Sequence, residues 1–296
     1  MLVNARLLAA TAMAAALTVT ASANAGTSKH YHVFKPTSFK DVAAQVLPPA
    51  LDMNYYGGSV FSSSKVEVVF WNKDVLQNTK DKIPLFTADL VDSTYVDQMA
   101  EYKTKGAKAI NGHKSTNQTI HRGTYLGQVQ LKPHNTSTTL TDEDVQKELA
   151  RQISDGVLPP RDPNTLYMIY FPSNISISLD GSLSCQAFGA YHFATNDAKI
   201  AKKKNIFYAV EPECNSGFGF LTFAASHEFA EATTDNVPTP GSNPDFPQAW
   251  NDASGFEVGD KCGGSGTLAG TGGNWEVTQI YLNSKHACST GNYTSP

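Results

Sequence analysis

Residues 226–235 have the sequence SHEFAEATTD, and the prediction of the fold starts from this stretch. An alanine-rich run over residues 221–225 precedes it and two prolines follow it, so the pattern predicts one helix that ends before the prolines. Residues four apart in a helix lie one turn above each other, and His227 and Glu231 therefore project from the same face. Glu228 lies one position further round, close enough to reach a water molecule held by that pair.

The spacing of these residues matches the H-E-x-x-H helix of zinc proteases, with glutamate in the place of the second histidine. A carboxylate oxygen is an accepted zinc ligand, so His227 and Glu231 are candidate zinc ligands. Glu228 is the candidate general base for a water molecule beside them. The alternative is a solvent-exposed helix face whose charged residues came together by chance.

One helix supplies only two ligands, so a third must come from elsewhere in the chain. The segment GFEVGDKC, residues 255–262, follows about thirty residues after His227 and offers Glu257 as the third zinc ligand. Asp260 would then orient His227 through its other ring nitrogen, or join the ligand set itself.

Two other interpretations of these acidic residues stay open. Asp235, Asp252, Glu257 and Asp260 could be oxygen ligands of a calcium ion. Asp235 is a poor partner for His227 in one unbroken helix, because eight residues rise roughly 12 Å. The remaining alternative is an acidic, solvent-exposed loop without any metal.

A second cluster, CQAFGAYH over residues 185–192, ends in a histidine beside a tyrosine. His192 could supply a nitrogen ligand, or either His192 or Tyr191 could stabilise an oxyanion, and we assign His192 a catalytic role. The alternative is a hydrogen-bonded structural histidine. The other six histidines have no comparable context and are left outside the predicted site: His30, His32, His113, His121, His134 and His286.

The first 25 residues are predicted to be a signal peptide. Arg6 precedes an apolar run over residues 7–20, and the small-x-small pattern at residues 23–25 predicts cleavage after Ala25. Residues 26–296 would form the secreted domain, and no later segment qualifies as a membrane span. Without Arg6 the chain has 22 basic and 27 acidic residues, a net charge of −5, and no basic patch. We therefore expect a secreted monomer with no nucleic-acid or membrane partner.

All four cysteines lie in the second half of the chain. An even number in an exported protein favours two disulfides over a metal site, since no C-x-x-C pair exists. Of the three possible pairings we favour the sequential one, Cys185–Cys214 and Cys262–Cys288.

The hydrophobic pattern predicts an α+β fold in a single domain. Strands are expected over residues 65–71, 125–131, 166–171, 206–210 and 277–282. Apart from residues 226–235, helical patterns cover a short stretch at 39–46, a stripe of apolar residues over 85–102, and 141–153 after a capping pair. Residues 236–274 are rich in glycine, proline, asparagine, aspartate and serine, which predicts a long irregular segment of the kind that often carries function.

The motifs at residues 226–235 and 257–262 together resemble the paired signature of the Exordium/phosphate-induced secreted proteins and their microbial relatives. Residues 55–71, 90–102 and 185–192 fit the same resemblance, which thus covers most of the predicted mature chain. The plant members of this family are extracellular, and the relatives look like zincin metallopeptidases with H-E-x-x-E in place of H-E-x-x-H. The resemblance implies a zincin-like domain built on a mixed sheet and an active-site helix.

From the motifs and the resemblance together we expect a secreted zinc-dependent endopeptidase that acts on a protein or peptide substrate. His227, Glu231 and Glu257 would hold Zn²⁺, with Asp260 beside them, and Glu228 would be the general base. The alternative is a non-catalytic extracellular binding or signalling protein with a structural metal ion, either zinc or calcium. A single nitrogen ligand is unusual for catalytic zinc, and this favours the alternative.

Overall fold

A computed structural model describes residues 31–291 of the chain, so the predicted signal peptide lies outside the described residues. The helices are α1 (Phe39–Ala44), α2 (Gln77–Val91), α3 (Thr94–Met99), the 3-10 helix η1 (Ala100–Tyr102), α4 (Asp142–Ser154) and α5 (Phe218–Thr234). The strands are β1 (Asn54–Tyr55), β2 (Ser63–Phe70), β3 (His121–Gln130), β4 (Thr139–Thr141), β5 (Thr165–Phe171), β6 (Ser176–Leu179), β7 (Ser182–Leu183), β8 (Tyr191–Thr195), β9 (Ile206–Pro212), β10 (Trp250–Asn251), β11 (Ser265–Ala269), β12 (Asn274–Thr278), β13 (Ile280–Leu282) and β14 (Ala287–Ser289).

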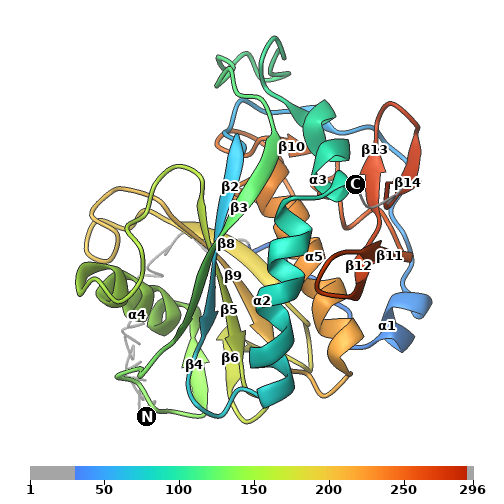
Figure 1. Cartoon of the computed structure of the whole chain (residues 1–296). Helices are drawn as coiled ribbons and strands as arrows, with labels where there is room; N and C mark the ends of the chain where they lie inside the picture. The colour runs from blue at the N-terminus through green and yellow to red at the C-terminus, as the bar shows by residue number, and fades with distance from the viewer. Residues whose placement is uncertain (1–30, 292–296) are drawn as a thin grey trace, which may run out of the picture.

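The main sheet has five strands in the order β3-β2-β5-β9-β8 (Figure 1). Its first four strands are parallel, and β8 runs antiparallel to β9 at one edge. The other strands form small sheets of two or three strands, which pair β1 with β10, β11 with β12, β13 with β14, and β6 with β4 and β7. The predicted α+β class and the mixed sheet are confirmed.

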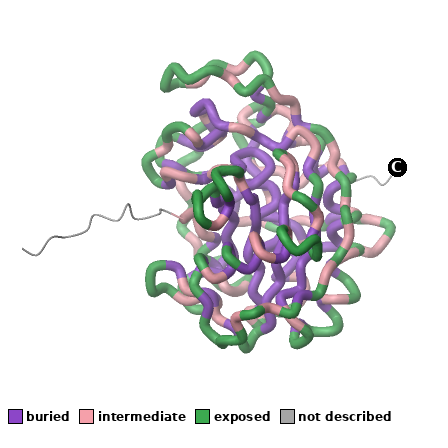
Figure 2. The backbone as a smooth tube through the Cα atoms, turned by 90° about the vertical axis from the view of Figure 1, so that its left-hand side faces the viewer, coloured by how far each residue is buried: buried purple, intermediate pink, exposed green. Residues whose placement is uncertain are grey.

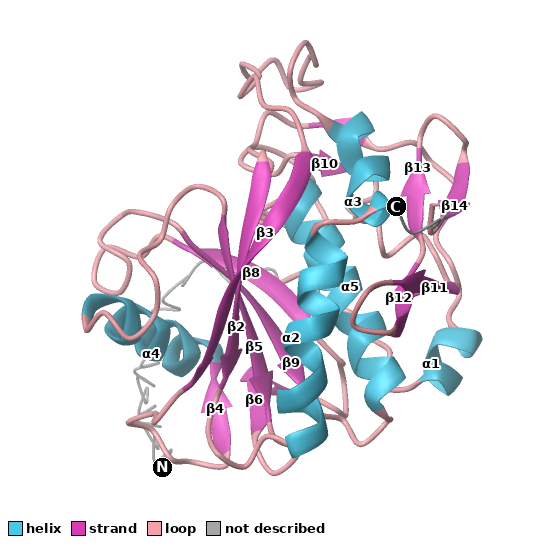
Figure 3. Ribbon diagram, in the orientation of Figure 1, coloured by secondary structure: helices cyan, strands magenta, loops and turns pink. Residues whose placement is uncertain are grey.

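Helices cover both faces of the main sheet (Figure 3). Alternate residues of β2 point to opposite faces, so Val66 and Val68 pack with α2 and α5 on one face while Val69 packs with α4 on the other. The same alternation along β8 directs His192 away from the α4 face, to which Tyr191 and Phe193 belong. Figure 2 shows the result, a buried centre surrounded by exposed loops.

The sequence predicted the long elements well and the short ones poorly. Every strand predicted over residues 65–71, 125–131, 166–171 and 206–210 is present, and Thr141 and Asp144 form the expected capping box of α4. The stripe of helical spacing over residues 85–102 is helical in the structure, but it is divided among α2, α3 and η1. The division occurs at Ser93, whose hydroxyl donates to the carbonyl of Leu90 and accepts from the amide of Tyr95, capping α3.

The predicted last strand, residues 277–282, is wrong in its bounds. The chain divides there into β12, which pairs with β11, and β13, which pairs with β14. Strand β14 follows both. Residues 236–274 are largely irregular, as expected, but also contain β10 and β11.

Both predicted disulfides are confirmed. The sulfur atoms of Cys185 and Cys214 lie 2.07 Å apart, and those of Cys262 and Cys288 lie 2.02 Å apart. Two disulfides fit an extracellular protein. Among residues 31–291, no helix has the length and hydropathy needed to cross a membrane.

Candidate metal centre

Helix α5, which carries the predicted motif, is buried along almost its whole length. It contacts β8 and β9 on the main sheet and β12 of the C-terminal segment (Figure 1). His227 and Glu231 are each 2 % exposed and Glu228 is 1 % exposed. The interpretation of this stretch as a solvent-exposed helix face is therefore wrong, because the C-terminal segment covers the face that the main sheet leaves free.

His227 and Glu231 meet on one face of α5, as the helical spacing predicted. Nε2 of His227 lies 2.9 Å from Oε1 of Glu231 and 3.7 Å from Oδ1 of Asp260. The backbone amide of Asp260 donates to the same Glu231 oxygen at 3.1 Å, which fixes the segment 255–262 against the helix. These three side chains form one of two groups among the described residues whose ligand atoms lie close enough together to hold a metal ion.

The second such group is His192, Glu228 and Glu231. Nδ1 of His192 lies 3.1 Å from Oε2 of Glu228, and Nε2 of His192 lies 3.1 Å from the carbonyl oxygen of Asp235. A carbonyl can only accept, so Nε2 carries the proton and Nδ1 of the neutral ring is an acceptor. Both ring nitrogens are thus engaged, and the contacts favour His192 as the residue that orients Glu228 rather than as an oxyanion-stabilising group.

The carboxyl group of Glu257 lies between two histidines of the site. Its Oε1 is 3.6 Å from Nε2 of His192, and its Oε2 is 3.4 Å from Nδ1 of His32. Glu257 is fully buried, and neither of its oxygens has a hydrogen-bond partner among the described residues.

His32 is the site residue that the sequence analysis missed. Its Nδ1 also lies 3.8 Å from Oδ2 of Asp260, and its side chain is only 12 % exposed. His32 lies in the polar stretch over residues 27–40, before every predicted strand, so only a tertiary contact reveals its place. The one available signal was the alternation in residues 31–34, Tyr-His-Val-Phe, which is typical of a short extended segment with its histidine on one face. His32 gives the site the further nitrogen that the sequence analysis did not find.

Burial dominates the electrostatics of the cluster. It raises the pKa of Glu231 and of Glu257 well above the ordinary glutamate value. Burial also lowers the pKa of His192 to about 4, so its imidazole is neutral near pH 7. The carboxyl groups of a metal-free site therefore cannot all ionise together, and a divalent cation would remove that conflict.

Asp260 is the exception among the carboxylates. Burial by itself would raise its pKa, but a hydrogen bond with His32 and the charge of His227 bring that pKa below the ordinary value. Asp260 therefore supplies a negative charge beside His227 in the metal-free site.

The side chains present fit a zinc ion. Both ring nitrogens of His227 are buried and form no hydrogen bond with the described residues, although Nε2 lies 2.9 Å from Oε1 of Glu231, as two ligand atoms without their shared ion would. Imidazole nitrogen together with carboxylate oxygen is a donor set that zinc accepts.

The oxygen set of the calcium alternative does not come together. Asp235 accepts hydrogen bonds from the amide of Ala249 and the side chain of Asn251. Asp252 forms a buried ion pair with Lys261, with Nζ 2.6 Å from Oδ2. Two of the four proposed calcium ligands are therefore held by other partners.

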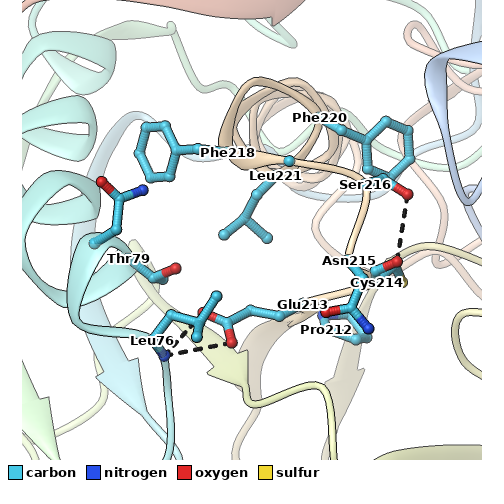
Figure 4. A pocket seen from close by; sticks show the side chains of 12 residues that line it. Leu76, Thr79, Pro212, Glu213, Cys214, Asn215, Ser216, Phe218, Phe220 and Leu221 are labelled. Carbon is cyan, nitrogen blue, oxygen red and sulfur yellow. Dashed lines mark hydrogen bonds between the residues drawn. The ribbon is translucent and has the colours of Figure 1, made fainter.

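The cavity drawn in Figure 4 lies elsewhere, between the start of α2, the end of β9 and the start of α5. It measures about 80 Å³ and contains one titratable side chain, Glu213, whose carboxylate accepts from the amide of Leu76 at 3.2 Å. Because it lacks a second chemical group, this cavity is no rival to the metal centre.

Comparison of the chain with protein-family models, with curated proteins and with solved structures found no match. The assignment of a function therefore rests on the geometry of the site and on the motifs that form it.

Proposed function

We propose that the protein is a secreted, zinc-dependent endopeptidase of the zincin type. The observation that supports this most is the convergence of His227, Glu231 and Asp260 beside a buried Glu228 that His192 holds in place. Ligands and base come from one helix turn and one loop, which is the arrangement that metal-assisted hydrolysis requires.

His227 and Glu231 would hold the ion, and the third ligand would be Asp260 rather than Glu257. Asp260 Oδ1 lies 3.7 Å from Nε2 of His227, whereas the contacts of Glu257 are to His192 and His32. In this assignment Glu257 lies behind the ligands, with its carboxyl group between His192 and His32.

When bound, zinc would acidify a water molecule and favour the ionised form of the nearby carboxyl groups. Glu228 would accept a proton from the water that attacks a peptide carbonyl and would return it to the leaving amine. In the metal-free site Nδ1 of His192 accepts a hydrogen bond from the protonated Glu228 carboxyl, and the carbonyl of Asp235 fixes His192 in turn. Glu228 must lose that proton before it can act as the base.

A second candidate is a structural metal ion in a binding or signalling protein. The observation that favours it is the closure of the site, since Glu257 is fully buried and His32 covers the ligands from the N-terminal side. Structural zinc sites use four protein ligands, whereas catalytic sites keep one position for water. His32 could supply that fourth ligand.

The deciding experiment is the substitution Glu228→Gln. Glutamine has nearly the same shape but cannot accept the proton, and Glu228 is not one of the proposed ligands. Loss of a general base typically costs ~10²–10⁴-fold in rate, so hydrolysis of casein by the zinc-loaded chain should fall by that amount. Zinc content by elemental analysis should stay at about one ion per chain, whereas His227→Ala should lose the ion.

The matched control is Glu143→Gln on the exposed surface of α4, which should leave the rate of hydrolysis unchanged. Removal of zinc with a chelator should stop hydrolysis, and added zinc should restore it. A zinc-loaded chain whose casein hydrolysis is the same in wild type and Glu228→Gln would refute the peptidase and leave the structural metal ion.

A further inference from the structure

Residues 31–44, which we define as the N-terminal arm, lie across the metal centre. The amide of Phe34 donates to the carbonyl of Ala190 at 3.0 Å, and the amide of Gly189 donates to the carbonyl of Phe34 at 2.7 Å. This antiparallel bridge forms just before β8, the edge strand of the main sheet. The arm thus binds the sheet edge through its backbone, as an extended peptide ligand does.

The side chains of the arm alternate between the site and the opposite core. His32 contacts Glu257 and Asp260, and the ring of Phe34 lies 4.6 Å from the ring of His227. Tyr31 points the other way, donating to Asp142 at 2.8 Å and packing against Phe193. His32 and Phe34, two positions apart in the arm, therefore cover the metal centre.

An apolar pocket receives the aromatic residues of the arm. Phe34 is 4 % exposed and packs with Phe220 and Phe223 of α5, and Phe39 of α1 lies against the same two rings. The arm is therefore docked by specific contacts and does not merely pass over the site.

The segment that follows the arm is exposed and outside every disulfide loop of the described chain. Val46 is 93 % exposed and Leu47 is 46 % exposed. The two disulfides begin at Cys185 and Cys262, so neither ties the arm to the rest of the chain. A cut within residues 45–47 would leave the arm held by non-covalent contacts alone.

We propose that the N-terminal arm is an autoinhibitory segment. His32 and Phe34 occupy the place of a peptide ligand, and the arm is released when the chain is cut after α1. This inference rests on the proposed peptidase function for its consequence, but the docking of the arm can be tested without it. The tethered arm faces the site at an effective concentration of about 1 mM. With a Kd of about 10 µM, the tethered arm would cover about 99 % of the sites and leave about 1 % open. After the cut, the arm would cover almost no sites at nanomolar protein. The open fraction, meaning the share of chains whose site is not covered by the arm, therefore rises about 100-fold.

The test uses the full mature chain with the recognition sequence of a site-specific protease inserted after Val46. Binding of a fluorescein-labelled peptide with the sequence of residues 31–38, YHVFKPTS, is followed by fluorescence polarisation. The peptide should bind the cut chain and not the intact chain. Peptides carrying His32→Ala or Phe34→Ala should bind the cut chain at least about ten-fold more weakly. A labelled peptide that binds the intact chain as well as the cut chain, or neither, overturns the proposal.

Release of the arm gives a second readout. After the cut, size-exclusion chromatography at nanomolar protein should separate the arm from the chain, which keeps its zinc. An arm that stays bound after the cut, or a chain that unfolds without it by circular dichroism, shows that the segment is a structural part of the fold and refutes the inference. In the intact chain, His32→Ala should uncover more of the sites and so increase binding of the labelled peptide. The control His286→Ala, at an exposed histidine paired with Asp52, should not change that binding.

Casein hydrolysis separates this inference from the proposed function. Cutting should raise the rate by about 100-fold, and Glu228→Gln should abolish the gain. If the arm leaves and the labelled peptide binds but no casein is cleaved, the docking of the arm stands and the peptidase fails. If Glu228-dependent hydrolysis is the same before and after the cut, the peptidase stands and the autoinhibition fails.

Discussion

Gly259 lies so close to the metal centre that no side chain fits there. A Cβ atom at this position would lie 2.6 Å from Nδ1 of His227 and 2.9 Å from Oε1 of Glu231. Both distances are below van der Waals contact, so the glycine allows the loop of residues 255–262 to approach the helix at the two ligands.

Gly259→Ala should therefore displace the ligands and weaken zinc binding by at least about ten-fold, which corresponds to 1.4 kcal/mol. The matched control is Gly219→Ala at the start of α5, where a Cβ would meet its nearest neighbour at 3.7 Å and where alanine favours the helix. Competition with a chromogenic chelator measures the zinc Kd of both variants. Equal affinities in the two variants would show that the approach at Gly259 does not position the ligands.

Glu67 on β2 gives a residue-scale test of pH dependence. Glu67 is 4 % exposed, and burial raises its pKa to about 7. Because the folded chain holds this proton more tightly than the unfolded chain, Glu67 makes stability fall as pH rises from about 4.5 to about 7. Glu67→Gln keeps the shape and removes the titration, so it should stabilise the protein at pH 8 by up to about 3 kcal/mol and have little effect at pH 4.

Urea unfolding of wild type and Glu67→Gln at both pH values, with the disulfides intact, measures this difference. A difference in the free energy of unfolding that does not change with pH would contradict the assignment.

The ligands on α5 were predictable because helical spacing is a local property. His227, Glu228 and Glu231 need only the period of one helix to fall on neighbouring positions. His32 was not predictable in the same way, since it reaches the site through the bridge between Phe34 and Ala190, a contact between segments far apart in sequence. No periodicity in one segment encodes such a contact.

At the scale of elements, the loop that carries Asp260 is held by a buried ion pair. Nζ of Lys261 donates to Oδ2 of Asp252 at 2.6 Å and to the carbonyl of Pro49 at 2.7 Å. Oδ1 of Asp252 accepts from the amides of Ser254 and Phe256. A segment that the sequence predicted to be irregular is thus ordered by side-chain contacts instead of by a ladder of backbone hydrogen bonds.

Lys261→Met should destabilise the protein by about 3–5 kcal/mol, because it leaves the Asp252 carboxylate buried without a counter-charge. Adding Asp252→Asn should recover much of that loss, since asparagine keeps the acceptor for the two amides and carries no charge. Urea unfolding of the zinc-loaded single and double variants measures both steps. A double variant less stable than Lys261→Met would refute this account of the loop.

The edge strand β8 shows why short elements escaped prediction. Its five residues, Tyr191–Thr195, form only a short stretch that ends at Asn196 and Asp197, and the sequence analysis treated His192 only as the end of a cysteine-containing cluster. Pairing with β9 through Tyr191–Val210 and the following residues makes this stretch a strand. That pairing then directs His192 towards Glu228.

In the whole molecule, three distant segments converge on one point. The N-terminal arm supplies His32, helix α5 supplies His227 and Glu231, and the loop after it supplies Asp260. The hydrophobic pattern along the chain predicted the fold class and the even cysteine count predicted two disulfides, because neither inference requires knowing which segments contact each other. The arrangement of the segments depends on which buried surfaces fit together, and a single sequence does not specify that in any local pattern.

The Cys262–Cys288 disulfide links that arrangement to metal affinity. Cys262 lies two residues after Asp260, and its partner lies 26 residues further along the chain. Replacing both cysteines with alanine should cost about 3–4 kcal/mol of stability in the loop-entropy model, and should also weaken zinc binding because Asp260 is less firmly placed. Replacing Cys185 and Cys214, which are 29 residues apart, should cost a similar amount of stability without the same loss of zinc affinity, since no proposed ligand lies beside them. Urea unfolding and chelator competition on both double variants, under non-reducing conditions, measure the two effects separately. Equal losses of zinc affinity would mean that the disulfide near Asp260 acts on the stability of the whole fold and has no particular part in positioning the ligand.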